Sequence, residues 1–193
     1  MNGMRILVAG LVGGIVMFGW GFVSHMVLKI GEMGVENLPE EAVVLPVMKT
    51  SIHERGFYFF PGVQEGAGEA EMKAWGDKYA AGPRGVLIYD PEPGVVAMDP
   101  KMLGIEFGSN VLAAVLAAGV LASVGGGVGR RTVVAAAVGV ISWVSIDVSY
   151  WNWYRFPSEM IEGQFLGEVI GWTVSGLAMA LVMGSAKKAA AKV

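Results

Sequence analysis

Four long apolar stretches constrain the fold of this 193-residue chain more than any other feature. Residues 6–28, 103–124, 132–149 and 164–183 are predominantly apolar, and about 20 such residues are needed to cross the hydrocarbon core of a membrane. Charged residues make up 16% of the chain, against about 25% in soluble domains. The sequence therefore predicts an all-α membrane protein. We expect a four-transmembrane-helix bundle with a small α+β insertion between helices 1 and 2.

The expected domain organisation follows from these stretches. Residues 1–30 contain the first helix, residues 31–101 form an extracytoplasmic α+β loop domain, and residues 102–193 carry helices 2–4 with short loops and a cytoplasmic tail. The first stretch is longer than the apolar region of a signal peptide and lacks a cleavage site of small residues. We therefore expect it to be a retained anchor.

The loop of residues 31–101 contains local signals for both strands and helices. Residues 56–60 and 85–89 are rich in β-formers, and a turn signal follows each run. Residues 69–81 favour a helix that Gly82-Pro83 would end. A further helix is expected to start near Pro39, with Pro46 shortening or kinking it. We predict a two-stranded, hairpin-like element with one or two helices.

Positive charges predict the orientation in the membrane, because lysine and arginine near the ends of spans mark the cytoplasmic side. Arg5 precedes the first span, Arg130 and Arg131 separate the second and third, and three lysines follow the fourth, at positions 187, 188 and 192. These segments contain no acid. We predict that both termini are cytoplasmic and that residues 31–101 and 150–163 are extracytoplasmic.

Small residues predict how the spans associate. The fourth span has one at every fourth position from Gly163 to Ser175, and the first has Gly10 and Gly14. Such stripes let membrane helices approach closely. The sequence leaves open whether they pack within one chain or between subunits. The expected partners are membrane lipids and further subunits, either copies of this chain or other membrane proteins. The net charge of −3, without a basic block, argues against nucleic acid.

Six polar residues are expected at similar depth, in the outer leaflet, on four different helices: His25, Glu106, Asn110, Asp147, Gln164 and Glu168. Ionisable groups in a membrane are costly and tend to face the interior of a bundle. One interpretation is an interhelical structural network. A second is a site for a divalent metal such as zinc, manganese or iron, or for a proton, and a third is a pocket for a small ligand. The candidate metal ligands are His25, Glu106, Asp147 and Glu168.

Residues 147–157 read DVSYWNWYRFP and form a dense aromatic cluster. Tryptophan and tyrosine favour the membrane–water boundary, so we interpret this stretch as the place where a helix leaves the bilayer. An interfacial aromatic belt explains it, and a lipid or quinone site is the functional alternative. The candidate contact residues for such a ligand are Asn110, Tyr150, Trp151, Trp153, Tyr154, Gln164 and Trp172.

The chain has no cysteine, which excludes disulfides, thiolate nucleophiles and iron–sulfur clusters in this sequence. It also lacks the nucleophile-elbow, zinc-protease and dinucleotide-binding motifs. The sequence identifies no catalytic residue, and it leaves the cofactor unknown, with a divalent metal as the candidate. The expected function is non-enzymatic, as a homo-oligomer or an accessory subunit of a membrane assembly. The alternatives are a metal- or proton-linked enzyme or transporter, and a lipid- or quinone-binding protein.

Two segments carry a resemblance to known proteins: WGFVSHMVL at residues 20–28 and YWNWYRFP at residues 150–157. They resemble four-transmembrane-helix bacterial proteins with a long first extracytoplasmic loop. The resemblance implies a location in the bacterial cytoplasmic membrane. That family carries no established activity, so it supplies no catalytic or binding residue for this chain.

Overall fold

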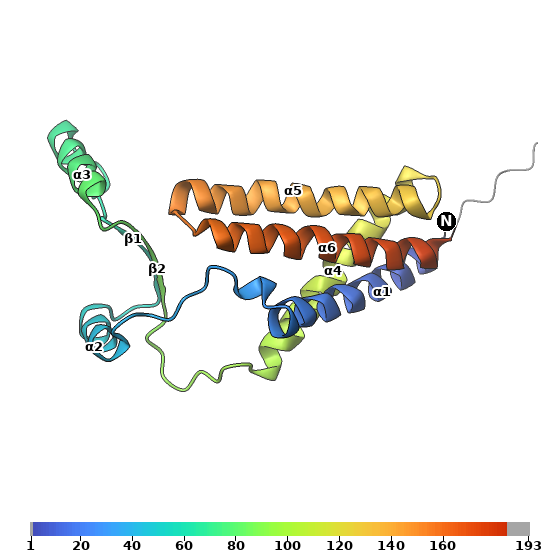
Figure 1. The fold of residues 1–193 in the computed structure, drawn as a ribbon, viewed down its shortest axis with the longest axis horizontal. Helices are drawn as coiled ribbons and strands as arrows, with labels where there is room; N and C mark the ends of the chain where they lie inside the picture. The colour runs from blue at the N-terminus through green and yellow to red at the C-terminus, as the bar shows by residue number, and fades with distance from the viewer. Residues whose placement is uncertain (1, 185–193) are drawn as a thin grey trace, which may run out of the picture. The chain divides into compact units, whose positions relative to one another are not determined.

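The computed structural model describes residues 2–184 and is mostly helical, at 71%, with one small two-stranded sheet (Figure 1). The chain divides into two compact units. The first, here called the helical unit, combines the chain up to Val35 with the chain from Met98. The second, the inserted unit, is Glu36–Ala97. The three C-terminal lysines used to predict orientation lie outside the described residues.

Among residues 2–184, four helices of the helical unit are long and apolar enough to cross a membrane. They are α1 (Gly3–Phe22), which continues into the π-helical turn η1 (Val23–Val27), α4 (Pro100–Val124), α5 (Val128–Tyr154) and α6 (Ser158–Met183). The apolar stretches predicted from the sequence lie within them, apart from Leu28, which follows η1 directly. The expectation of four long apolar helices is confirmed.

The ends of α5 and α6 differ from the expected spans. Residues 132–149 were expected to form the third span, but α5 continues through the aromatic cluster to Tyr154. Helix α6 then begins at Ser158, so only residues 155–157 connect the two helices. The aromatic residues from Tyr150 to Tyr154 are helical, whereas Phe156 lies in the connection. Helix α5 ends at Arg155, which adopts the left-handed conformation with φ of 62°.

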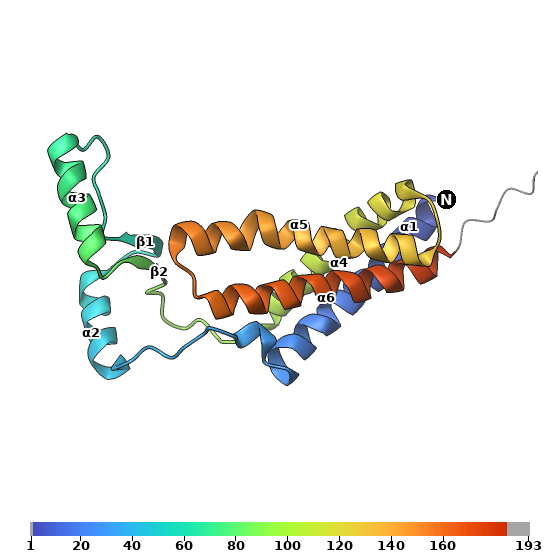
Figure 2. The same ribbon diagram turned by 45° about the horizontal axis from the view of Figure 1, so that its top comes forward.

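The helices of the helical unit pack in the spatial order α4, α1, α6, α5. Helix α1 packs against both α4 and α6, and α5 packs along α6, whereas α4 and α5 contact each other only slightly. Figures 1 and 2 show α5 and α6 side by side along their length. The core lies where α1 begins and α6 ends, and it consists of Ala9, Ala114, Ala117, Ala118, Leu121, Ala135, Met179 and Met183.

Glycines allow this close packing within one chain. A Cβ atom on Gly14 would lie 2.5 Å from the Cα atom of Val111 in α4. On Gly171 of α6 it would lie 2.8 Å from the indole of Trp20 in α1. In contrast, a Cβ atom on Gly167 would meet no atom within 4 Å. Most of the small-residue stripe of α6 therefore serves packing inside the chain.

The inserted unit contains α2 (Glu41–Ser51), β1 (Gly56–Phe60), α3 (Glu69–Ala81) and β2 (Gly85–Tyr89). The strands pair antiparallel, with Gly56 opposite Tyr89 and Phe60 opposite Gly85. Both strands and the helix of residues 69–81 have the bounds expected from the sequence. Of the two effects expected of Pro46, shortening of the preceding helix is wrong, because α2 continues beyond that proline to Ser51, and a kink stays a prediction.

The inserted unit, Glu36–Ala97, spans fewer residues than the expected loop domain of residues 31–101. The short 3-10 helix η2 (Ile30–Glu32) packs against α6 and belongs to the helical unit. A Cβ atom on Gly163 of α6 would lie 2.6 Å from the carbonyl oxygen of Ile30, so the chain lies tightly on α6 at this point. The contact explains why the unit boundary falls after Val35.

Candidate functional site

His25 lies in the π-helical turn that follows α1. Its Nδ1 atom is 3.0 Å from the carbonyl oxygen of Gly21 and 3.2 Å from the hydroxyl of Ser24. Its ring also lies directly against Gly31, where any added Cβ atom would clash with it. These contacts are all local, so His25 helps to turn the chain from α1 into η2.

Glu106 and Asn110 pair on one helix. The side-chain amide of Asn110 donates to Glu106 Oε1 at 3.1 Å, one turn apart along α4. The side chain of Glu106 is exposed and that of Asn110 is half-buried. The structure thus pairs these two candidates with each other along a single helix.

Asp147 and Glu168 come together from two helices. Asp147 on α5 is close enough to Glu168 on α6 for their charges to interact. The indole of Trp172 donates to Glu168 Oε2 at 3.1 Å, and Ser142 is a further hydrogen-bond partner. Gln164 lies one turn before Glu168 and is half-buried. This arrangement joins α5 and α6 through a half-buried polar cluster.

The four candidate metal ligands do not gather at one point. Among residues 2–184, no three His, Asp or Glu side chains are grouped so that they could hold a metal ion. Of the proposed set, only Asp147 and Glu168 interact across two helices, and as two carboxylates they repel each other. The structure therefore lends the predicted metal set no geometric support, and the set stays a prediction.

The aromatic cluster builds a turn between α5 and α6. The ring of Tyr150 lies 5.8 Å from that of Tyr154 and 5.3 Å from that of Phe156, measured between centroids. The carbonyl of Tyr150 accepts hydrogen bonds from the backbone N–H groups of Arg155 and Phe156. Trp153 is 69% exposed. The turn is therefore held by backbone bonds and ring contacts together.

A small hollow lies on this turn. Its volume is about 150 Å³, and its lining residues are Trp151, Asn152, Arg155 and Phe156. The indole of Trp151 donates to the hydroxyl of Ser158 at 3.3 Å, which links the hollow to the first residue of α6. Of the predicted ligand-contact residues, Trp151 alone lines this hollow.

Sequence reasoning missed a set of hydrogen bonds between helices. The indole of Trp20 donates to the carbonyl of Gly167, and that of Trp143 to the carbonyl of Ile161, each at 2.9 Å. The buried hydroxyl of Ser175 donates to the carbonyl of Gly13 at 2.9 Å. Because every residue offers a carbonyl, no sequence signal identifies which one a tryptophan will reach.

Two arginines also bind carbonyls at helix ends. Arg5 Nε donates to Val182 O at 3.0 Å, and Arg131 Nη1 donates to Gly184 O at 2.6 Å. Arg131 Nε donates to Leu121 O at 3.3 Å, and this side chain is only 5% exposed. Cations are favoured at the C-terminal ends of helices, where carbonyls lack partners. Arg5 and Arg131, which were used to predict the membrane orientation, thus also link α1, α4, α5 and α6 through hydrogen bonds.

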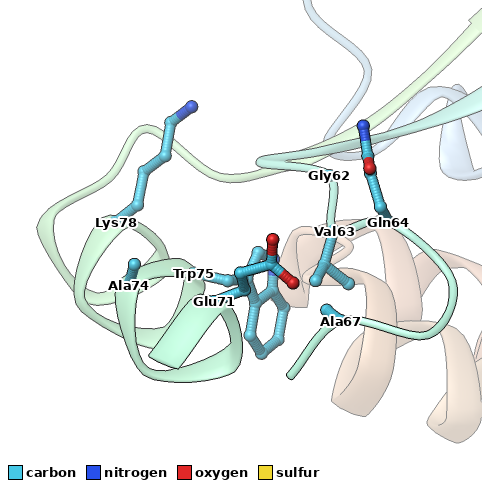
Figure 3. A pocket seen from close by; sticks show the side chains of 8 residues that line it. All are labelled: Gly62, Val63, Gln64, Ala67, Glu71, Ala74, Trp75 and Lys78. Carbon is cyan, nitrogen blue, oxygen red and sulfur yellow. The ribbon is translucent and has the colours of Figure 1, made fainter. Parts of the chain in front are cut away.

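The inserted unit has an open pocket of about 280 Å³ beside α3. Figure 3 shows the side chains of Val63, Trp75 and Glu71 around it, with Gln64 and Lys78 farther apart at its rim. The indole of Trp75 donates to the carbonyl of Pro61 at 2.9 Å. The carboxylate of Glu71 accepts from the backbone N–H of Gly68 at 3.0 Å, so it serves to cap α3.

Comparison of the chain with protein-family models, with curated proteins and with solved structures finds no match.

Proposed function

We propose that this chain is a multi-pass protein of the bacterial cytoplasmic membrane with four transmembrane helices. The supporting observation is that the most apolar windows of the four helices are only 11% to 33% buried within the chain. Soluble monomers rarely expose contiguous apolar patches larger than a few hundred Å². Lipid is the natural environment for such a surface, and it makes the exposure of these side chains favourable.

We propose further that both termini are cytoplasmic and that the inserted unit and the turn at residues 155–157 are extracytoplasmic. Arg5, Arg130 and Arg131 lie at the end of the helices opposite to this turn. Positive charges mark the cytoplasmic side.

The natural absence of cysteine gives a direct test of this topology. Three variants each carry a single cysteine, in place of Ser51 in the inserted unit, Ser123 near the end of α4 or Ser145 within α5. A membrane-impermeant maleimide added to intact cells should label Ser51→Cys alone. Ser123→Cys should react only after the membrane is opened, and Ser145→Cys should react slowly in both cases. Labelling of Ser123→Cys but not Ser51→Cys in intact cells would reverse the orientation.

The proposed role is non-enzymatic: the chain acts as a subunit of a homo-oligomer or of a larger membrane assembly. The inserted unit supports this role, because Pro61 is the only buried residue among residues 36–97, all of which the structure describes. Burying an exposed aliphatic or aromatic side chain is worth about 1.5–3 kcal/mol. Large exposed apolar residues on this unit include Leu38, Val43, Leu45, Val47, Phe57, Ile88, Val95 and Val96. A protein partner would cover this surface.

The assembly role is tested by the oligomeric state of the full chain. Ile88 is 75% exposed, and its replacement in Ile88→Asp places a charge on the proposed contact surface. Ala70→Asp adds the same charge at an exposed residue in the first turn of α3 and is the matched control. Cross-linking in membranes, followed by mass measurement in detergent, should reveal a complex that Ile88→Asp weakens and Ala70→Asp preserves. A strict monomer with no co-purifying partner would overturn the role.

The electrostatic interaction between the half-buried Asp147 and Glu168 is the observation behind a second candidate function, a metal- or proton-linked membrane enzyme or transporter. Ionisable residues inside membrane helices often mark ion or proton pathways. Elemental analysis of the purified chain beside Asp147→Asn and Glu168→Gln tests the metal form of this candidate. Stoichiometric metal that both variants lose would support it, whereas metal-free, folded protein would count against stable metal binding.

A further inference from the structure

The hollow on the turn between α5 and α6 has the size and chemistry of a site for a small anionic group. Its volume of about 150 Å³ equals that of about five water molecules in the liquid. Arg155 brings a guanidinium group with five N–H donors, and Asn152 brings an amide. Trp151 and Phe156 contribute aromatic walls. An arginine fork of this kind matches the oxygens of a phosphate group.

The charge of Arg155 is available to a ligand. Its side chain is exposed, and the ion pairs among residues 2–184 join Lys29 to Glu32, Arg55 to Asp90 and Lys73 to Asp77, without Arg155. In the part of the chain that the structure describes, no carboxylate forms an ion pair with the guanidinium of Arg155, including those at the start of α6.

The backbone at Arg155 adopts an unfavourable conformation. With φ at 62° and ψ at 35°, the residue lies in the left-handed region, which glycine or asparagine adopts more readily. For other residues the Cβ atom crowds the following carbonyl oxygen in this conformation, which makes it unfavourable. The hydrogen bonds from the Arg155 and Phe156 N–H groups to the carbonyl of Tyr150 fix the turn. An arginine therefore occupies a position where its backbone is unfavourable, which is consistent with a role for its side chain.

An apolar track leads away from the hollow along α5. Val144, Val140 and Val133 precede Trp151 by seven, eleven and eighteen residues, so all four lie on one face of the helix. All four side chains are exposed. At 1.5 Å per residue, Val140 lies about 16 Å along the axis from Trp151. This length is close to one leaflet of a hydrocarbon core that is about 30 Å thick.

We propose that this hollow binds the phosphate of a glycerophospholipid from the extracytoplasmic leaflet, with an acyl chain lying along Val144 and Val140. Arg155 binds the phosphate oxygens, Asn152 donates a further hydrogen bond, and Trp151 lies at the boundary between headgroup and chain. A free phosphate would use the same polar groups but would gain nothing from the apolar track. The site rests on the proposed membrane insertion and adds a specific lipid position to it.

The test measures binding to the full chain purified in detergent by isothermal titration calorimetry. The probes are didecanoylphosphatidylglycerol, whose acyl chains are long enough to reach Val144, didecanoylglycerol, which lacks the phosphate, and inorganic phosphate. Arg155→Gln should weaken binding of the phospholipid about tenfold, as expected for loss of a charge-assisted hydrogen bond. Lys101→Gln is the matched control, because it removes one exposed charge at the same end of the helices. It should leave the affinity unchanged.

The lipid assignment is overturned if Arg155→Gln binds phosphatidylglycerol as the native chain does. It is also overturned if inorganic phosphate binds as tightly as the phospholipid, since the site would then serve a free anion. A third variant, Val144→Asn, should weaken binding of the phospholipid and leave the response to inorganic phosphate unchanged. Circular dichroism confirms that each variant is folded.

A carbonate wash of native membranes separates this proposal from the membrane proposal on which it rests. Release of the chain from membranes by carbonate would contradict insertion itself. A chain that stays in the membrane but binds phosphatidylglycerol independently of Arg155 would contradict only the lipid site.

Discussion

The helical unit and the inserted unit expose apolar side chains to a similar degree but differ in how they are held together. The helical unit has a buried cluster of eight apolar residues, and glycines bring its helices into close contact. The inserted unit buries only Pro61 among residues 36–97, and apart from the strand pair its helices and strands make few contacts with one another. The exposed apolar side chains of the helical unit therefore surround a packed core, whereas those of the inserted unit do not.

The difference lies in the surroundings that each unit requires. In lipid, an exposed valine or leucine is well solvated, so helices gain stability from close packing and from hydrogen bonds between them. In water, the exposed phenylalanines and valines of the inserted unit remain unfavourable until another surface covers them. A two-stranded sheet is also marginal by itself. On the proposed membrane insertion, lipid would cover the helical unit, and we propose that a protein partner covers the inserted unit.

The largest expected effect is on the glycine contacts of the helical unit. In Gly14→Leu, the new side chain would meet the backbone of Val111, since even a Cβ atom would lie 2.5 Å from its Cα atom. We expect a loss of about 3 kcal/mol of unfolding free energy. Gly19→Leu is the control on the same helix, because its Cβ atom would meet nothing within 4 Å. Unfolding by SDS in micelles, followed by circular dichroism, measures both. Equal losses would contradict the proposed role of the α1–α4 contact.

The next effect concerns the buried arginine. Arg131→Gln removes a cation that donates to Gly184 O and Leu121 O. Hydrogen bonds to charged groups contribute about 1.5–3 kcal/mol, so we expect a loss of about 2 kcal/mol in the same unfolding assay. Arg130→Gln removes the same charge from an exposed neighbour and should change the stability little. If Arg130→Gln destabilised as much, the effect would arise from net charge near the membrane.

The sequence predicted those parts of the fold that have local signals in the chain. Residues 56–60, 69–81 and 85–89 have local signals, namely β-formers, helix formers and turn residues, and the structure gives elements with those bounds. The apolar stretches predicted the four long helices for the same reason. The continuation of α5 to Tyr154 was missed, because the preference of aromatic residues for an interface concerns depth in a membrane and not helical geometry.

The candidate site was predictable only in part, because residues at the same depth need not face one another. His25 and Glu106 were expected to join Asp147 and Glu168, yet His25 bonds to Gly21 and Ser24 within its own turn. Sequence spacing gives the face of a helix but not which neighbour that face meets. For the same reason the sequence left open whether the glycine stripes pack within the chain or between chains.

A smaller effect is expected at the bond between α6 and α1. Ser175→Ala removes the buried hydroxyl that donates to the carbonyl of Gly13. Hydrogen bonds between membrane helices average about 0.6 kcal/mol, so a loss of about this size is expected. Ser123→Ala is the matched control, because its exposed hydroxyl donates to Val120 within its own helix. A much larger loss for Ser175→Ala would show that the hydroxyl also fills space that the alanine leaves empty.

The smallest effect on stability is expected in the inserted unit, where an exposed side chain has few partners within the chain. Val47 on α2 is 60% exposed, so Val47→Ser should change the unfolding free energy of the isolated chain by less than about 0.5 kcal/mol. If a partner covers α2, the same change should still weaken the complex, because a buried apolar contact is lost there. Loss of chain stability without loss of the complex would mean that α2 packs inside its own chain. Loss of the complex alone would identify the exposed face of α2 as part of the assembly surface.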